Sequence, residues 1–292
     1  MIVSASYRTD IPAFYAPWFV ARLDAGYCRV VNPYGGAIGE VSLRPEAVDG
    51  FVFWTRNLRP LLPHLDRVRR VAPFIVQFTM TGYPRSLESS VVAPAEAVAQ
   101  MREIRRRFGR RAAVWRYDPI VLTSELDATA HVAGFAALAA ELAGTVDEVA
   151  LSFANPYRKT RRNLDRAAAR YGFAWHDPAA DEKRSLLARL AAVAAEHGIA
   201  PTLCSQPELL VSGLGEARCI DAERLSDVAQ APLAAPEKGN RPGCRCALSR
   251  DIGAYDTCPH GCVYCYAVAD RDRALARYRA HDPDADCLAI NT

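Results

Sequence analysis

The sequence lacks any long apolar run. No window of its 292 residues predicts a membrane-spanning helix, and Met1–Ser4 passes directly into the polar stretch Tyr7–Asp10 without the apolar core of a signal peptide. These absences argue against a membrane protein and against a secreted one. We therefore expect a cytoplasmic protein with no membrane partner.

An excess of one charge is also absent. Thirty-six Lys and Arg stand against thirty-three Asp and Glu, and the net charge of +3 is too small to predict a nucleic-acid partner. Two basic runs remain. The run from Arg102 to Arg111 predicts a solvated helix face. The run Arg158–Arg162 directly follows a predicted strand, where it could contact phosphate, so we expect a small-molecule or phosphate-bearing substrate.

No G-x-G-x-x-G follows the first apolar run, which weakens a dinucleotide-binding interpretation. What recurs instead is a short apolar run followed by a stretch with helical spacing, and this pattern predicts a parallel sheet. The predicted strands are residues 2–5, 51–54, 74–78, 113–116, 149–153 and 201–203. The predicted helices between them include residues 94–108, 127–143 and 182–197.

At least six strands alternating with helices predict an α/β fold, a (β/α) barrel of TIM-like type, complete or partial. We expect residues 1–204 to form the main part of the barrel. Residues 205–247, rich in Pro, Gly and charge, are expected to form an irregular insert that contains cysteines. Residues 248–292 are expected to complete the same domain.

In a barrel of this kind, polar residues at the carboxyl ends of the strands face the site. For each residue alone, a helix cap or a local ion pair is the competing interpretation: Asp10 could start a helix at Ile11, and Arg116 could pair with Asp118. The whole set predicts a site for a zwitterion with a ribose. The catalytic candidates are Arg8, Asp10, Arg116 and Asp118, and the candidate cofactor contacts are Asn57, Gln77, Thr79 and Ser152.

Cysteine is scarce outside one region. Of nine cysteines, seven lie between residues 204 and 265, and the odd total in a chain with no export signal argues against a disulfide framework. Cys28 and Cys287 stand apart and are interpreted as small apolar or incidental residues.

The strongest pattern is Cys258, Cys262 and Cys265, spaced C-x3-C-x2-C with the aromatic Tyr264 before the third thiol. Three thiolates without a fourth suit a [4Fe-4S] cluster with one open iron, whereas structural zinc takes four ligands. A zinc site would need Cys246 or His260 as the fourth ligand.

A second set of four cysteines lies in and beside the expected insert: Cys204, Cys219, Cys244 and Cys246. Their number matches a closed [4Fe-4S] cluster or an all-thiolate zinc site. Electron relay, substrate ligation and simple stapling of the segment all stay open.

The C-x3-C-x2-C loop resembles that of the radical S-adenosylmethionine (SAM) enzymes, and residues 258–266 are also similar to the loop of the spore photoproduct lyase group. Nearly the whole chain resembles an uncharacterised family, a domain of unknown function, whose C-terminal cysteines are similar to the radical SAM cluster site. The segments that carry this resemblance are residues 4–13, 53–57, 115–120, 219–221 and 251–258.

The resemblance implies a radical SAM enzyme with a [4Fe-4S] cluster and SAM as cofactors, in which Cys258, Cys262 and Cys265 hold the cluster and Tyr264 lies at the cofactor. It implies reductive cleavage of SAM to a 5'-deoxyadenosyl radical, with an electron donor such as a flavodoxin or ferredoxin; cleavage to an aminocarboxypropyl group is an alternative. A non-catalytic iron–sulfur or zinc sensor and a nucleic-acid repair lyase are the competing functions.

In most radical SAM proteins the cysteine loop follows the first strand, whereas here it lies near the C-terminus. A circular permutation would reconcile the two orders. It predicts a strand at residues 248–252, a helix at 266–279 after the loop, and the N-terminal strand beside that unit.

Overall fold

The computed structural model describes residues 1–33, 35 and 37–288. Its strands are β1 (Ile2–Ala5), β2 (Tyr27–Val31), β3 (Ile38–Ser42), β4 (Gly50–Thr55), β5 (Phe74–Thr79), β6 (Ala113–Ile120), β7 (Leu122–Thr123), β8 (Glu148–Phe153), β9 (Trp175–His176), β10 (Ala200–Leu203), β11 (Gly215–Glu216) and β12 (Ser249–Asp251). Its α-helices are α1 (Ile11–Phe14), α2 (Ala16–Ala25), α3 (Leu65–Val71), α4 (Pro94–Phe108), α5 (Ala128–Leu142), α6 (Arg158–Tyr171), α7 (Ala180–Glu196), α8 (Ala222–Ala229) and α9 (Arg271–Arg279). Short 3-10 helices are Leu62–His64, Arg110–Ala112 and Pro207–Leu209.

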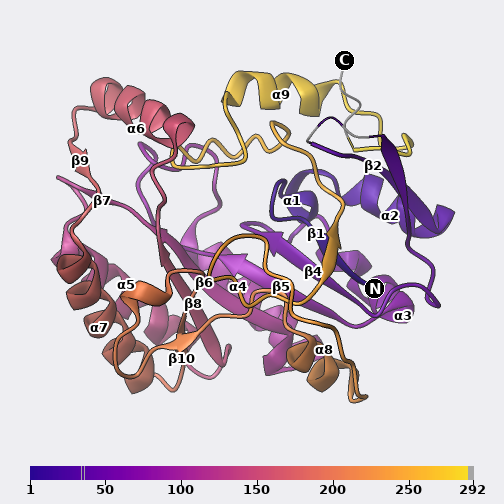
Figure 1. The fold of residues 1–292 in the computed structure, drawn as a ribbon, viewed down its shortest axis with the longest axis horizontal. Coiled ribbons are helices and arrows are strands. Elements are labelled where there is room, and N and C mark those ends of the chain that lie inside the picture. The colour runs from indigo at the N-terminus through magenta and orange to yellow at the C-terminus, as the bar shows by residue number, and fades with distance from the viewer. Residues whose placement is uncertain (34, 36, 289–292) are drawn as a thin grey trace.

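The main sheet has eight strands in the order β11-β10-β8-β6-β5-β4-β1-β12, and every pair in it is parallel. Strand β1 pairs with β12, with Ile2 opposite Ser249 and Ser4 opposite Asp251, so the predicted adjacency of the two ends of the chain is confirmed. Figure 1 shows β1 beside the late segment that contains β12. Within the described residues no pairing joins β11 to β12, so the sheet is compatible with a TIM-like barrel but is not shown closed.

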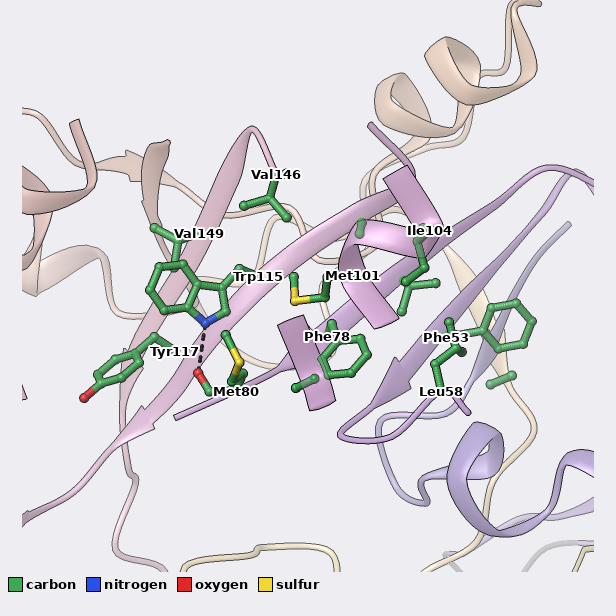
Figure 2. Close-up of a cluster of buried hydrophobic side chains, with 14 of the residues drawn as sticks. Phe53, Leu58, Phe78, Met80, Met101, Ile104, Trp115, Tyr117, Val146 and Val149 are labelled. Carbon is green, nitrogen blue, oxygen red and sulfur yellow. Dashed lines mark hydrogen bonds between the residues drawn. The ribbon is translucent and has the colours of Figure 1, made fainter. Parts of the chain in front are cut away.

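Alternation along the strands divides the sheet into two faces, because successive side chains point to opposite sides. On the outer face, Phe51, Phe53, Phe74, Phe78 and Trp115 join the large apolar core beneath the helices. Figure 2 shows part of this core, where Met101 and Ile104 of α4 lie among the strand residues. The indole of Trp115 donates a hydrogen bond of 2.8 Å to the carbonyl of Met80. Each buried side chain of this size contributes roughly 2–3 kcal/mol of transfer free energy.

The other face, called the inner face below, has a smaller apolar core. Ile2, Val52, Ile75 and Val114 come from alternate strand positions and pack with residues of the 204–247 segment. That segment crosses in front of the sheet in Figure 1, with α8 next to β5. We expected it to be irregular, but it contains the 3-10 helix Pro207–Leu209, β11 and α8. Regular structure forms there because Leu225 and Ile220 are buried against the sheet.

Most elements agree with the sequence patterns. The predicted helix 94–108 is confirmed at both ends, and Asp10 caps α1 by accepting a hydrogen bond from the Ala13 amide. The hairpin of β2 and β3 was not predicted, because its strands are short and partly exposed. No helix in the described part of the chain is long and apolar enough to cross a membrane.

The basic run of α4 and the turn after it forms surface ion pairs, as predicted: Arg102 with Glu141, Arg106 with Glu103 and Arg111 with Asp147. Asp147 also pairs with Arg224, which is buried. Burial acts to raise the pKa of Asp147, but the hydrogen bonds and charges of Arg224 and Arg111 outweigh it and hold the pKa below the ordinary 3.8.

This ion pair predicts a pH dependence of stability. A carboxylate whose pKa is lower in the folded state stabilises the fold fully above its unfolded pKa, and the contribution is lost as pH falls through the folded pKa. The urea midpoint of wild type should therefore exceed that of Asp147→Asn at neutral pH, and the difference should shrink below pH 3.8. Asp181→Asn, at a carboxylate 98% exposed, is the control and should show little difference at any pH. A gap that widens toward acid would contradict the prediction.

Candidate functional site

The three-cysteine loop, residues 258–265, lies between β12 and α9 at the carboxyl end of the sheet. The Tyr15 hydroxyl donates to the Thr257 carbonyl at 2.7 Å, the Val263 amide donates to the Leu87 carbonyl at 3.0 Å, and the Ser90 amide donates to the His260 carbonyl at 2.9 Å. Hydrogen bonds with Tyr15, Leu87 and Ser90 thus hold the loop from both sides. In Figure 1, α9 and the start of the chain lie on either side of this region.

Cys258, Cys262 and Cys265 are half-buried free thiols. They are mutual electrostatic neighbours, since the charge of Cys265 raises the pKa of both other thiols. Burial is the larger cause: it raises the pKa of Cys262 to about 12 and those of Cys258 and Cys265 above their ordinary value. A bound cation would oppose these shifts, because the thiolate is the form that binds metals.

Neither residue that could have completed a zinc tetrahedron is available to the loop. His260 Nε2 contacts Asp10 Oδ2 at 2.7 Å and its Nδ1 contacts the Ser90 carbonyl at 3.2 Å, so both ring nitrogens are engaged. Cys246 belongs to the second cysteine set. Among the residues that the structure describes, no group of three or more His, Cys, Asp or Glu is arranged to hold a single metal ion. In a cluster, each thiolate binds a different iron, and convergence on one point is not required.

Tyr264 anchors the loop in a buried polar network. Its hydroxyl donates to Glu88 Oε1, which also accepts from Thr81 at 2.6 Å and pairs with Arg56 at 2.9 Å. Arg56 Nη2 lies 2.5 Å from the same hydroxyl, and its charge acts on Cys262. Thr79 lines a pocket of about 170 Å³ together with Arg56 and Glu88. The network therefore places a cation beside the thiols.

Two buried carboxylates join the N-terminal strand to the loop. Asp251 accepts hydrogen bonds from Ser4, Ser6 and the Tyr7 amide, and it pairs with Arg8 at 2.8 Å. Asp10 accepts from Thr55 and from the Arg56 amide, both at 2.7 Å, in addition to His260. Arg8 and Asp10 are thus engaged in contacts within the chain, and Asp10 reaches the loop through His260.

Polar side chains replace apolar ones toward the carboxyl end of the inner face. The members of this inner row come from five adjacent strands and are Ser4, Trp54, Gln77, Arg116 and Ser152. They form one chain of contacts: the Trp54 indole donates to Ser4 at 3.1 Å, and the Arg116 guanidinium lies 4.9 Å from the Trp54 ring. Arg116 also contacts Gln77 at 3.3 Å. The row connects the Asp251 network to the middle of the sheet.

Arg116 forms an ion pair with Asp118, which is the competing interpretation for these two catalytic candidates, and Ser152 donates to the same carboxylate. Burial acts to raise the pKa of Asp118, but the Arg116 charge and these hydrogen bonds keep it below its ordinary value. Asp118 is therefore a carboxylate at neutral pH, which makes it a hydrogen-bond acceptor.

The second set, called the four-cysteine group below, gathers at the inner face. The Sγ atoms of Cys204 and Cys219 are 3.5 Å apart, and the thiol of Cys246 acts on the pKa of both Cys219 and Cys244. Burial and the hydrogen bond with Cys219 raise the pKa of Cys204, whereas the hydrogen bond with Cys246 lowers the pKa of Cys244 to about 6. The four thiols therefore lie near one another, and what they bind stays a prediction.

The structure therefore separates the predicted site residues. Gln77, Arg116, Asp118 and Ser152 come together beside the four-cysteine group, while Arg8, Asp10, Thr79 and Tyr264 lie around the three-cysteine loop. Asn57 lies elsewhere, since its side-chain oxygen accepts from Gln100 of α4. The patterns missed Glu88, Trp54 and Asp251. The signal for Glu88 is indirect. Arg56 is buried and needs a counter-charge nearby, and Glu88 supplies it.

The run Arg158–Arg162 begins α6 and lies on the side of the loop, as predicted. Arg162 donates to the Ala269 carbonyl at 3.0 Å, and Lys159 Nζ lies 5.6 Å from the Tyr255 ring. Arg161 donates to the Pro156 carbonyl. Three of the five residues, Lys159, Arg161 and Arg162, thus contact neighbouring segments.

The fold and the site define a class: α/β proteins with a parallel sheet whose carboxyl end carries a three-cysteine loop. Within it, the chain belongs to the family described as Domain of unknown function (DUF1848), whose model matches residues 2–267. No curated protein and no solved structure matches the chain.

Proposed function

We propose that the protein is a radical SAM enzyme, in which Cys258, Cys262 and Cys265 hold a [4Fe-4S] cluster with one open iron. The observation that carries the proposal is a loop with three neighbouring free thiols at the carboxyl end of a parallel sheet, to which the described residues add no fourth protein donor. When bound, the cluster supplies an electron that cleaves SAM reductively to methionine and a 5'-deoxyadenosyl radical.

Strand order supports the same proposal. The loop follows β12, which is the last strand in the order and pairs with β1. Reading the sheet from β12 onward gives β12, β1, β4, β5, β6 and β8, so the loop follows the first strand of that series. A circular permutation of the radical SAM core would produce this order.

The chain's own residues divide the remaining tasks. Arg56, held by Glu88 and Tyr264, offsets negative charge at the thiols. The inner row contains a guanidinium, an amide and an indole, the kinds of group that bind a carboxylate and a ring. Lys159 lies near Tyr255 on the α6 side, where it can contact a phosphate-bearing substrate.

Anaerobic reconstitution with iron and sulfide, followed by a SAM assay under strong reductant, tests the proposal. We expect 5'-deoxyadenosine and methionine in equal amounts, and methylthioadenosine in their place if the aminocarboxypropyl group is released. A fully loaded cluster that turns over no SAM with several candidate substrates would favour an iron–sulfur sensor. Absence of DNA and RNA binding at low salt would remove the repair-lyase alternative.

A further inference from the structure

The four-cysteine group has a geometry that differs from that of a closed site for a single metal ion. An all-thiolate zinc site places four sulfurs about 2.3 Å from one ion, so each sulfur neighbours all of the others. Here the Sγ atoms of Cys204 and Cys219 are 3.5 Å apart, Cys246 acts on the pKa of both Cys219 and Cys244, and Cys244 is linked back to Cys204 through the Ser205 hydroxyl. In the described part of the chain, no three such donors are arranged around one ion.

The four thiols of the group differ in exposure to solvent. Cys204, Cys219 and Cys246 are buried, whereas Cys244 is only half-buried. Cys244 lies in a hairpin closed by the bridge between Glu237 and Ala247 and by the bond from the Lys238 amide to the Cys246 carbonyl at 2.8 Å. The four-cysteine group therefore extends from the half-buried Cys244 at the surface to Cys219 at the inner row.

Two arginine guanidinium groups face the buried thiols Cys204 and Cys219. Arg116 Nη1 donates to Cys219 Sγ at 2.8 Å, and Arg241 Nη2 donates to Cys204 Sγ at 3.6 Å. A guanidinium next to a sulfur stabilises the negative charge that develops on it during thiol–disulfide exchange. The separation of 3.5 Å between Cys204 and Cys219 needs only a small movement to reach bonding distance, about 2.05 Å.

We propose that Cys204 and Cys219 are a redox-active dithiol that exchanges with an external disulfide or dithiol through Cys244 and Cys246. A thiolate of Cys244 attacks the external disulfide and releases one thiolate; Cys246 attacks the mixed disulfide and releases the second. Cys219 then attacks Cys246, and Cys204 closes the disulfide with Cys219 while Cys244 and Cys246 return to thiols. Two electrons and two protons pass from the protein to the external disulfide, which leaves as two thiols.

The four-cysteine group shares no thiol with the three-cysteine loop, so failure of the dithiol proposal would leave the radical SAM proposal intact. The group adjoins the inner row, because Cys219, whose sulfur accepts from Arg116, becomes part of the disulfide. The redox state of the pair thus acts on the inner row directly.

The test equilibrates the full-length protein in buffers of oxidised and reduced dithiothreitol, then alkylates free thiols and maps them by peptide mass spectrometry. We expect Cys204 and Cys219 to lose reactivity together and to appear as one linked peptide pair. Cys244→Ser should slow the approach to equilibrium about tenfold without moving the midpoint, because it removes the entry point and not the pair. Cys28→Ser, outside the group, should change neither.

Two results would overturn the proposal. One is that Cys204 and Cys219 stay reduced in the most oxidising buffer. The other is one zinc, or a second cluster of about four irons, that stays bound when all three loop cysteines are replaced by Ala and is lost in Cys219→Ser. If Cys219→Ser fails to fold, the rate and midpoint of Cys244→Ser, together with the metal content of wild type, still decide the question.

Discussion

Cys262→Ala is expected to abolish SAM cleavage and to remove most of the bound iron. Cys262 is the central thiol of the loop, is half-buried, and has Cys258 and Cys265 as electrostatic neighbours. The substitution leaves two thiolates for a cluster that needs three, so one more iron lacks a protein ligand. The iron content should therefore fall from about four per chain to a small fraction of that. Product formation should fall to the background of the reductant alone.

The matched control is Cys28→Ala, which removes a buried free thiol of β2 far from the loop in sequence. It should keep wild-type iron content and activity, apart from a modest loss of stability. Circular dichroism and urea unfolding of apo Cys262→Ala should match those of the wild-type apo protein. Full SAM turnover by Cys262→Ala would exclude the loop as the cluster site.

Asp251→Ala is expected to lower the free energy of unfolding by about 3–5 kcal/mol, because it leaves the buried Arg8 without its counter-charge. The same change deprives Ser4, Ser6 and the Tyr7 amide of their acceptor. Urea denaturation of the apo protein measures the effect. Asp251→Asn keeps the shape and should lose less, since part of the hydrogen bonding survives.

Glu141→Ala provides the comparison, because it breaks an ion pair with Arg102 in which both side chains are more than half exposed. Exposed pairs contribute at most about 1 kcal/mol. If Asp251→Ala were no more destabilising than Glu141→Ala, the N-terminal strand would not depend on Asp251, and the link between the two ends of the chain would need another explanation.

The parallel sheet could be predicted because its strands are short apolar runs separated by helices of clear periodicity. Phe74–Thr79 is an almost continuously buried apolar run, as expected of a central parallel strand, and the buried positions Ala97, Met101 and Ile104 of Pro94–Phe108 recur every three or four residues. The adjacency of β1 and β12 followed from the order of the loop and strands. The β2–β3 hairpin could not be predicted in this way, because its two strands are partly exposed and their sequences do not alternate regularly between apolar and polar residues.

The candidate site was predictable only in part. The cysteines could be predicted as ligands from their type and spacing, and the pairing of Arg116 with Asp118 could be predicted from their proximity in sequence. The partners of Tyr264 and Arg8 lie 176 and 243 residues away, so no local pattern could assign them. The division into a loop network and an inner row depends on which face each strand end presents, and that is fixed only once the register of the sheet is known.

The most direct test of the radical SAM assignment is the electron paramagnetic resonance spectrum of the reduced, reconstituted protein with and without SAM. The sample is a variant without the thiols of the four-cysteine group, so that only the loop can bind a cluster. Our account predicts about four irons per chain and a [4Fe-4S] signal that changes when SAM binds the open iron. A signal unaffected by saturating SAM, or zinc bound in place of iron, would contradict it.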